Sequence, residues 1–173
     1  MSLLAFLLAF APGPVTADSA DPLAPSLKGQ VQCYGPNVER KTCVSIGAYA
    51  KDAQGVIQNT ATVLMAASPQ IIMTTKAPVE VKAGAVCGAI RMRDLETASF
   101  VIDGTPADAT DADAVRKAIA PAYAPFLDKE FCTVYRADGP GLVGEVTVGG
   151  VRRRELDQRM RWISPAEGYV VKP

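Results

Sequence analysis

Four cysteines restrict the folds open to this chain more than any other feature: Cys33, Cys43, Cys87 and Cys132. An even number of cysteines in an exported chain most simply forms two disulfides, and four cysteines can pair in three ways. The turn sequence Tyr34-Gly35-Pro36-Asn37 can fold the first pair back on itself. We therefore predict a Cys33–Cys43 disulfide and, from the remaining pair, a Cys87–Cys132 disulfide that ties a central strand to a late one.

A metal site is the alternative use of four cysteines. Structural zinc sites usually bring cysteines in pairs two to four residues apart, and no two cysteines here are that close. The chain also lacks histidine, the usual metal-binding side chain. The acidic segment Asp108–Asp113 has the spacing of a calcium loop only at its start, because Ile119 stands at the twelfth position, where such a loop needs glutamate. We expect no metal and no cofactor.

The N-terminal residues have the pattern of a secretory signal peptide. Leu3–Phe10 is a run of eight apolar residues, and Val15-Thr16-Ala17 is typical of a cleavage site after Ala17. The run is too short to span a membrane as a helix, which takes about 20 residues. No lysine or arginine precedes it, so the alternative is a buried N-terminal helix of a cytosolic protein. We predict a signal peptide over residues 1–17, a periplasmic or secreted location and no transmembrane span.

The remaining chain has the size of one domain. Residues 18–27 are rich in proline and small residues and predict a disordered lead-in. Residues 28–173 then form a single domain, long enough to bury one hydrophobic core. Lysine plus arginine and aspartate plus glutamate each number 18, so the formal net charge is zero and no nucleic-acid partner is expected.

Most of this domain has the pattern of short strands. The runs Thr42–Lys51 and Val56–Met65 flank Asp52-Ala53-Gln54-Gly55, a polar turn that ends in glycine, and so predict a hairpin. Several later β-like runs follow at short intervals: Gln70–Lys76, Val79–Lys82, Val86–Met92, Ser99–Ile102, Phe131–Arg136, Leu142–Val148 and Val151–Arg154. This spacing favours an antiparallel sheet or a partial barrel.

One helix is predicted, beginning at Thr110. Its apolar residues recur every three or four positions and give one apolar face: Val115, Ala118, Ile119, Ala122, Tyr123, Phe126 and Leu127. Pro121 and Pro125 each remove a helical hydrogen bond, so we expect a kink or break near Ala120. The predicted fold class is α+β, with an antiparallel, disulfide-stapled sheet or partial barrel and one kinked helix packed on a face.

Two turns share a spacing. Tyr49-x-x-Asp52-x-x-Gly55 and Tyr135-x-x-Asp138-x-x-Gly141 each lie between two β-like runs, and a cysteine precedes each. One interpretation is a duplicated hairpin. The other is that hairpin turns favour aspartate and glycine in any case.

Four sequence segments resemble those of a family of small exported proteins of Gram-negative bacteria: QCYGPNVERKTC (32–43), VKAGAVCG (81–88), KEFCTVY (129–135) and ISPAEGYVVKP (163–173). This family is uncharacterised and has no known activity. The chain resembles that family from about Gln30 to its end. The resemblance implies an exported location and a cysteine framework, and it carries over no catalytic or binding residue.

Little in the sequence indicates catalysis. Without histidine, Ser-His-Asp and Cys-His arrangements are excluded. Carboxylate pairs can hydrolyse glycosides without histidine, and Asp94 and Glu96, beside Arg91 and Arg93, are the best local group. Surface ion pairs explain that group equally well.

The most unusual charged segment is a candidate binding patch: Arg152, Arg153, Arg154, Arg159, Arg161 and Trp162. Guanidinium groups bind carboxylates and phosphates, and an indole can stack. The interleaved Glu155 and Asp157 favour internal ion pairs instead. We expect a non-catalytic periplasmic or secreted module that binds a protein or an envelope component such as an anionic glycan. The alternative is a carboxylate-dependent hydrolase of the cell envelope.

Overall fold

The computed structural model describes residues 21–173, so the predicted signal peptide and the start of the lead-in lie outside the described residues. Within this range the chain forms thirteen strands: β1 (Val31–Tyr34), β2 (Thr42–Cys43), β3 (Ser45–Lys51), β4 (Ile57–Ala67), β5 (Gln70–Lys82), β6 (Ala85–Ala89), β7 (Ser99–Ile102), β8 (Thr105–Pro106), β9 (Glu130–Asp138), β10 (Gly141–Val148), β11 (Val151–Arg152), β12 (Gln158–Ile163) and β13 (Val170–Val171). The α-helices are α1 (Met92–Glu96) and α2 (Ala109–Tyr123). Short 3-10 helices are η1 (Ala24–Lys28), η2 (Ala124–Phe126), η3 (Arg154–Leu156) and η4 (Pro165–Glu167).

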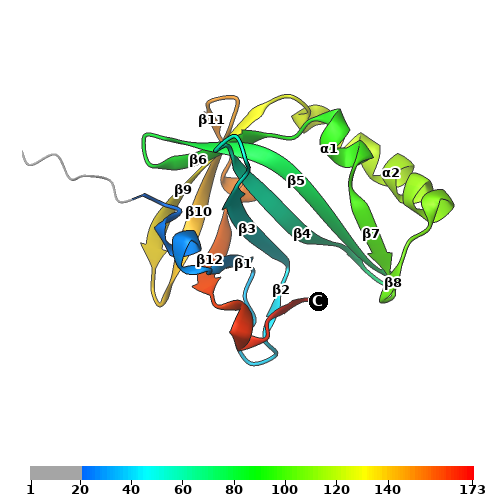
Figure 1. Cartoon of the computed structure of the whole chain (residues 1–173), viewed down its shortest axis with the longest axis horizontal. Helices are drawn as coiled ribbons and strands as arrows, with labels where there is room; N and C mark the ends of the chain where they lie inside the picture. The colour runs from blue at the N-terminus through cyan, green and yellow to red at the C-terminus, as the bar shows by residue number, and fades with distance from the viewer. Residues whose placement is uncertain (1–20) are drawn as a thin grey trace, which may run out of the picture.

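Eight of these strands close into an antiparallel barrel (Figure 1). Their order around the barrel is β1, β3, β4, β5, β6, β9, β10 and β12, and β12 pairs back with β1. Neighbours around the barrel therefore follow one another along the chain, which makes it an up-and-down barrel. Closure gives every one of these strands two partners and leaves no exposed edge in the circuit.

The closed barrel corrects the predicted fold class. The expected antiparallel, disulfide-stapled sheet is present, but the protein is mostly β instead of a balanced α+β fold, and the barrel is closed instead of partial. Closure depends on the pairing of Val31 with Ile163 at the two ends of the domain. No local pattern indicates a pairing at that separation in sequence.

The strands β4 and β5 are longer than their partners and run beyond the barrel wall (Figure 1). The first part of β5 pairs with β7, and the last part pairs with β6. The helices α1 and α2 cover this extension and bury an apolar cluster, here called the helix-side core. Its fully buried members are Met73, Leu95, Ala98, Phe100, Ala112 and Val115.

The helix α2 confirms part of the predicted apolar face and corrects its boundaries, since Ala118 and Ala122 are exposed and Ala112 is buried instead. Val115, Ile119 and Tyr123 all pack in the helix-side core. The helix is capped by Asp108 instead of Thr110, because the Asp108 carboxylate accepts hydrogen bonds from the backbone amides of residues 110 and 111. Pro121 lies inside the helix, which continues as α-helix to Tyr123 and then tightens into η2. The change of geometry therefore comes three residues later than expected.

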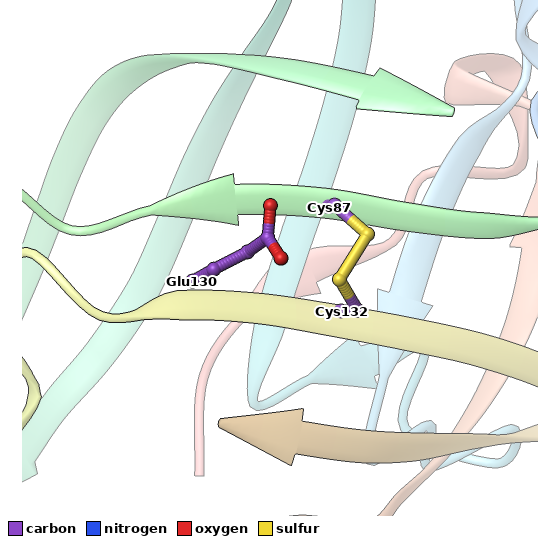
Figure 2. A group of neighbouring side chains, drawn as sticks. All are labelled: Cys87, Glu130 and Cys132. Carbon is purple, nitrogen blue, oxygen red and sulfur yellow. A yellow bond between two sulfur atoms is a disulfide. The ribbon is translucent and has the colours of Figure 1, made fainter. Parts of the chain in front are cut away.

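Both disulfides join the predicted pairs. Cys33–Cys43 links β1 to β2, where β13 pairs with β2 and the C-terminal segment covers the bond. Cys87 and Cys132 are directly opposite residues on β6 and β9 (Figure 2). The neighbours of Cys87 and Cys132 on both strands line the barrel interior, so this disulfide lies on the outer face of the wall.

The described part of the predicted lead-in differs from the expectation. Residues 24–28 form η1, and the Leu23 side chain is 4% exposed. Burial of this one leucine holds the segment against the domain, and the Ser26 backbone amide donates to the Leu23 carbonyl within the turn. The α-helices within residues 21–173 are all too short or too polar to cross a membrane.

Candidate functional site

The interior of the barrel holds a cavity of about 280 Å³. Alternate residues of each strand point inward, as a barrel requires. They come from β4 (Asn59, Ala61, Val63), β5 (Met73, Thr75, Ala77, Val79) and β9 (Phe131, Thr133, Tyr135), with Tyr34 and Tyr49 from β1 and β3. Asp94 and Leu95 of α1 and Tyr123 of α2 complete the wall. The lining is mostly apolar and contains five aromatic side chains.

A cluster of three tyrosines around one glutamine forms the polar part of this wall, and we call it the tyrosine cluster: Gln32, Tyr34, Tyr49 and Tyr135. The amide oxygen Oε1 of Gln32 accepts hydrogen bonds from the hydroxyls of Tyr34 (2.7 Å), Tyr49 (2.8 Å) and Tyr135 (3.2 Å). The hydroxyls of Tyr34 and Tyr135 are also 2.7 Å apart. One buried side chain thus positions three phenols from three strands.

The amide of Gln32 is fully buried, at 0% exposure. Its Nε2 has no hydrogen-bond partner within residues 21–173, and an unsatisfied buried donor costs about 1–3 kcal/mol. Gly47 lies directly opposite on β3, and a Cβ there would make ordinary van der Waals contacts, 3.6 Å from Gln32 Oε1 and 3.4 Å from Asn59 Nδ2. An unpaired donor of this kind lowers the free energy of unfolding, which an apolar side chain at this position would not do.

The phenols of Tyr34 and Tyr49 are neutral. Burial is the main cause that raises the pKa of Tyr34 well above its ordinary value, and the neighbouring phenols raise it further. Burial likewise raises the pKa of Tyr49. The tilted ring of Trp162, whose centroid lies 6.4 Å from that of Tyr49, packs beside the cluster. The barrel interior thus presents neutral oxygen atoms on an aromatic surface.

Asp94 is the one acidic residue among the described residues that line the cavity, and it is 6% exposed. Its Oδ2 accepts a hydrogen bond from the backbone amide of Arg91. This hydrogen bond caps the N-terminus of α1. Glu96, the other carboxylate of the predicted hydrolase pair, is exposed and lies outside this wall. Asp94 also borders an outer groove with Asp52, but Asp52 is held by the hairpin turn and by Gln58. Among residues 21–173, Asp94 lines both the cavity and this groove, and Glu96 lines neither.

The candidate arginine patch is divided by the fold. On β12, Arg159 and Arg161 alternate with Met160 and Trp162, so the arginines and the indole point to opposite faces. Trp162 packs toward the tyrosine cluster instead of offering a stacking surface beside the arginines.

Internal partners occupy most of these guanidinium groups. Arg152 forms two bonds to the Asp157 carboxylate, at 2.6 and 2.5 Å, and Arg153 forms an ion pair with Glu155. Arg159 is 2.9 Å from Asp138, and Arg161 lies over the ring of Tyr169. Arg154 lies exposed in η3. The arginines of residues 152–161 thus form separate local contacts and do not converge on one anion-binding site.

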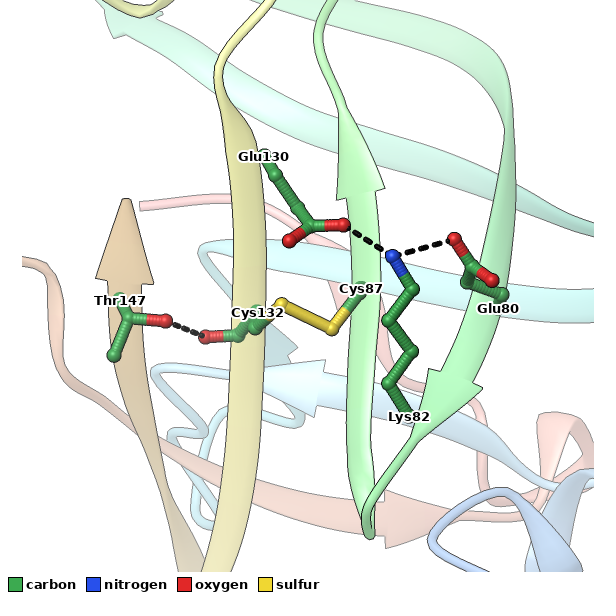
Figure 3. The surroundings of a disulfide bond; sticks show 6 residues. All are labelled: Glu80, Lys82, Cys87, Glu130, Cys132 and Thr147. Atoms are coloured by element: carbon green, nitrogen blue, oxygen red, sulfur yellow. Dashed lines mark hydrogen bonds and ion pairs between the residues drawn. A yellow bond between two sulfur atoms is a disulfide. The ribbon is translucent and has the colours of Figure 1, made fainter. Parts of the chain in front are cut away.

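The disulfide Cys87–Cys132 has a carboxylate beside it, that of Glu130 (Figure 2). Possible ligand atoms of these three residues lie within 4.8 Å of one another. Both sulfur atoms are used by the disulfide, however, and Lys82 Nζ lies 2.6 Å from Glu130 and 2.8 Å from Glu80 (Figure 3). The Glu130 carboxylate is thus already paired with Lys82, and the group serves the wall of the barrel.

Sequence reasoning missed the tyrosine cluster, although one signal pointed toward it. The repeated Tyr-x-x-Asp-x-x-Gly spacing picks out Tyr49 and Tyr135, which meet at Gln32 through strands on different sides of the barrel. Gln32 lies in the segment QCYGPNVERKTC (32–43), where the cysteines and the turn residues carry the predictions. A glutamine in a strand is most often solvent-exposed, and only the closed barrel shows that this one is buried.

These observations define a class: an eight-stranded up-and-down β-barrel with a cavity lined by aromatic and aliphatic side chains. Comparison with known proteins gives no match, since no protein-family model matches the sequence, no curated protein is detectably similar to it and no solved structure is detectably similar to the fold. The resemblance to exported proteins of Gram-negative bacteria stays a prediction.

Proposed function

We propose that this protein is a non-catalytic periplasmic or secreted binding module whose barrel holds one small, largely apolar molecule. The observation that carries the proposal is the cavity of about 280 Å³ inside a closed eight-stranded barrel. Barrels of eight strands are just wide enough either to be filled by side chains or to hold one small ligand. Here small residues such as Ala61, Ala77 and Gly88 line the space and leave it unfilled.

The size of the cavity limits the ligand. An apolar cavity of about 150 Å³ accommodates benzene, so this one suits a fused two-ring molecule of roughly ten non-hydrogen atoms. The two disulfides and the predicted signal peptide support an exported location. An envelope-associated small molecule is therefore the kind of component that the module would bind.

The test is calorimetric titration of the protein with benzofuran, a neutral bicyclic molecule of suitable size. We expect one site per chain with a dissociation constant between about 10 μM and 1 mM, from the usual free energy per ligand atom. Ala61→Leu places extra carbon atoms in the cavity and should weaken binding about tenfold or more. Ala50→Leu is the matched control, because Ala50 is exposed and adjacent to the inward-facing Tyr49 on β3. Absence of binding, or equal loss in both variants, would contradict the proposal.

A further inference from the structure

The strand β5 has two neighbours in the barrel, but part of it has a partner on one side only. Residues 71–74 of β5 pair with β7 and residues 79–82 pair with β6. Among residues 21–173, residues 75–78 therefore have a strand partner on the β4 side alone. Pro78 suits such a local edge, because proline has no backbone N–H to donate to a neighbouring strand. The helix α1, in the segment between β6 and β7, contacts β5 and covers this gap in the strand pairing (Figure 1).

The cavity and the outer groove meet at this gap. Thr75, Pro78 and Asp94 line the cavity inside the wall, and the same three residues line the groove outside it. Two of them belong to the unpaired part of β5, and Asp94 belongs to α1. At this point the two spaces are therefore separated by no more than one layer of side chains.

The groove is polar, whereas the lining of the cavity is mostly apolar. Beyond the shared residues, the groove is lined by charged, amide and hydroxyl side chains, among them Asp52, Gln58, Thr60, Lys76, Arg93 and Ser99. Hydroxyl and amide groups both donate and accept hydrogen bonds. The groove carries two carboxylates, two cationic groups and no net charge, so it has no excess of either charge to bind an ion. An uncharged group with several hydroxyls would find both donors and acceptors there.

We infer that the ligand spans both spaces: it is a small amphiphile with an apolar ring system in the barrel and an uncharged, hydroxylated head, such as one sugar, in the groove. This inference rests on the proposed function, because it extends the same ligand out of the same cavity. The gap beside α1 lets a molecule longer than the cavity leave the barrel without breaking a strand pairing. The head also keeps its contact with water, which it would lose inside the apolar cavity.

Three probes separate the inference from the proposed function. The compound 2-naphthyl β-D-glucopyranoside has both parts, 2-methoxynaphthalene keeps the ring and the ether oxygen without the sugar, and methyl β-D-glucopyranoside keeps the sugar without the ring. The protein is titrated into each naphthyl probe at a fixed low concentration, and the fluorescence of the ring reports binding. We expect the naphthyl glucoside to bind about 10-fold more tightly than 2-methoxynaphthalene, the effect of one or two hydrogen bonds. Calorimetry should detect no binding of methyl glucoside.

Each other result has a separate meaning. If 2-methoxynaphthalene binds and the naphthyl glucoside binds equally or more weakly, the inference is overturned while the proposed function stands. A closed cavity would give this result, because the glucoside is too long to be enclosed. Binding of methyl glucoside as tight as that of the naphthyl glucoside would also overturn the inference, since the ring would then contribute nothing. If neither benzofuran nor 2-methoxynaphthalene binds, the proposed function itself fails.

The variant Ser99→Trp tests which groove holds the head. Ser99 is exposed on β7 and lines the groove but not the cavity, so an indole there takes up the space of the sugar. Affinity for the naphthyl glucoside should fall about 10-fold, and affinity for 2-methoxynaphthalene should change less than about 2-fold. Val56→Trp is the matched control, because Val56 is exposed and borders a different outer groove beside Pro78, and it should change neither affinity.

The variant Ala61→Leu tests whether the ring lies in the barrel. It reduces the space inside the cavity and should weaken binding of both naphthyl probes. A glucoside affinity that falls in Val56→Trp and not in folded Ser99→Trp, or that is unchanged in Ala61→Leu, would overturn the inference. The ranking of the probes on the unmodified protein tests the inference even where a variant does not fold.

Discussion

The helix-side core and the barrel interior are two hydrophobic regions of one molecule, and they are built differently. The helix-side core is filled by apolar side chains such as Phe100 (3% exposed) and Ala98 (3% exposed). The barrel interior keeps a cavity of about 280 Å³ and buries a glutamine amide whose donor has no partner among residues 21–173. The two regions adjoin and share side chains at their boundary: Met73, Ile90, Leu95 and Tyr123.

The difference separates stability from function. Close packing in the helix-side core gains dispersion and hydrophobic energy and holds α2 on the extension of the barrel. An unfilled space with a partly unsatisfied polar cluster gives up part of that energy, and such features occur where a ligand completes the packing. The comparison predicts that substitutions in the first region change stability most and that substitutions in the second change binding most.

Phe100→Ala should have the largest effect on stability. Phe100 is buried in the helix-side core and its ring lies under the Arg116 guanidinium, so truncation leaves a large cavity. We expect a loss of about 3–5 kcal/mol in the free energy of unfolding, measured by urea titration. Benzofuran affinity should be retained in the folded fraction. A loss below about 1 kcal/mol would mean that the helix-side core is loosely packed. It would then not differ in packing from the barrel interior.

Loss of the Cys87–Cys132 disulfide should have the next largest effect. The paired change Cys87→Ser with Cys132→Ser removes the link between β6 and β9, and we expect a loss of about 2–5 kcal/mol. The melting temperature should fall far more than for Lys51→Ser, a change at an exposed strand end. Equal melting temperatures would show that the barrel wall does not depend on this bond.

Gln32→Met should have a smaller effect on stability than either change. It removes an orphaned amide donor, which is favourable, but it leaves phenol hydroxyls without their shared acceptor. We expect a net loss of about 1–3 kcal/mol, measured by urea titration. A loss as large as that of Phe100→Ala would indicate that the tyrosine cluster is the main structural core, and the division between the two regions would fail.

High pH should destabilise the protein, in part through the buried phenols of the barrel interior. Burial raises the pKa of Tyr34 and Tyr49, so above about pH 10 the unfolded chain loses phenol protons that the folded chain keeps. Their contribution is complete below pH 10 and is lost as the pH rises, on the order of 1 kcal/mol per pH unit for each buried phenol. Urea titrations at pH 9 and pH 11 should show this loss. Tyr34→Phe should reduce the pH dependence. A pH dependence equal to that of the unmodified protein would contradict burial of this phenol as the cause.

The sequence predicted the parts of this fold that local patterns determine. The Asp52–Gly55 turn forms, with Gly55 at φ 81°, because a polar turn between two alternating runs has few other solutions. The cysteine pairing and the apolar face of α2 follow from similarly local arguments.

Local sequence patterns could not predict that the barrel closes. The candidate site could not be predicted either, because its side chains meet only in the closed barrel. The β1–β12 pairing joins residues from opposite ends of the domain, so the inward positions of Gln32 and Trp162 appear only once the register is known. The division of the arginine patch could have been predicted in part, since strand alternation places Arg161 and Trp162 on opposite faces. The burial of Gln32 could not, because its polarity indicates the opposite.

The most direct test of the difference between the two regions is a crystal structure under xenon pressure, since xenon enters apolar cavities without needing a hydrogen bond. We predict xenon inside the barrel, among Ala61, Met73 and Phe131. The helix-side core around Phe100 should show none. A barrel interior without xenon, or equal occupancy in the helix-side core, would contradict the assignment of the barrel as the ligand-binding region.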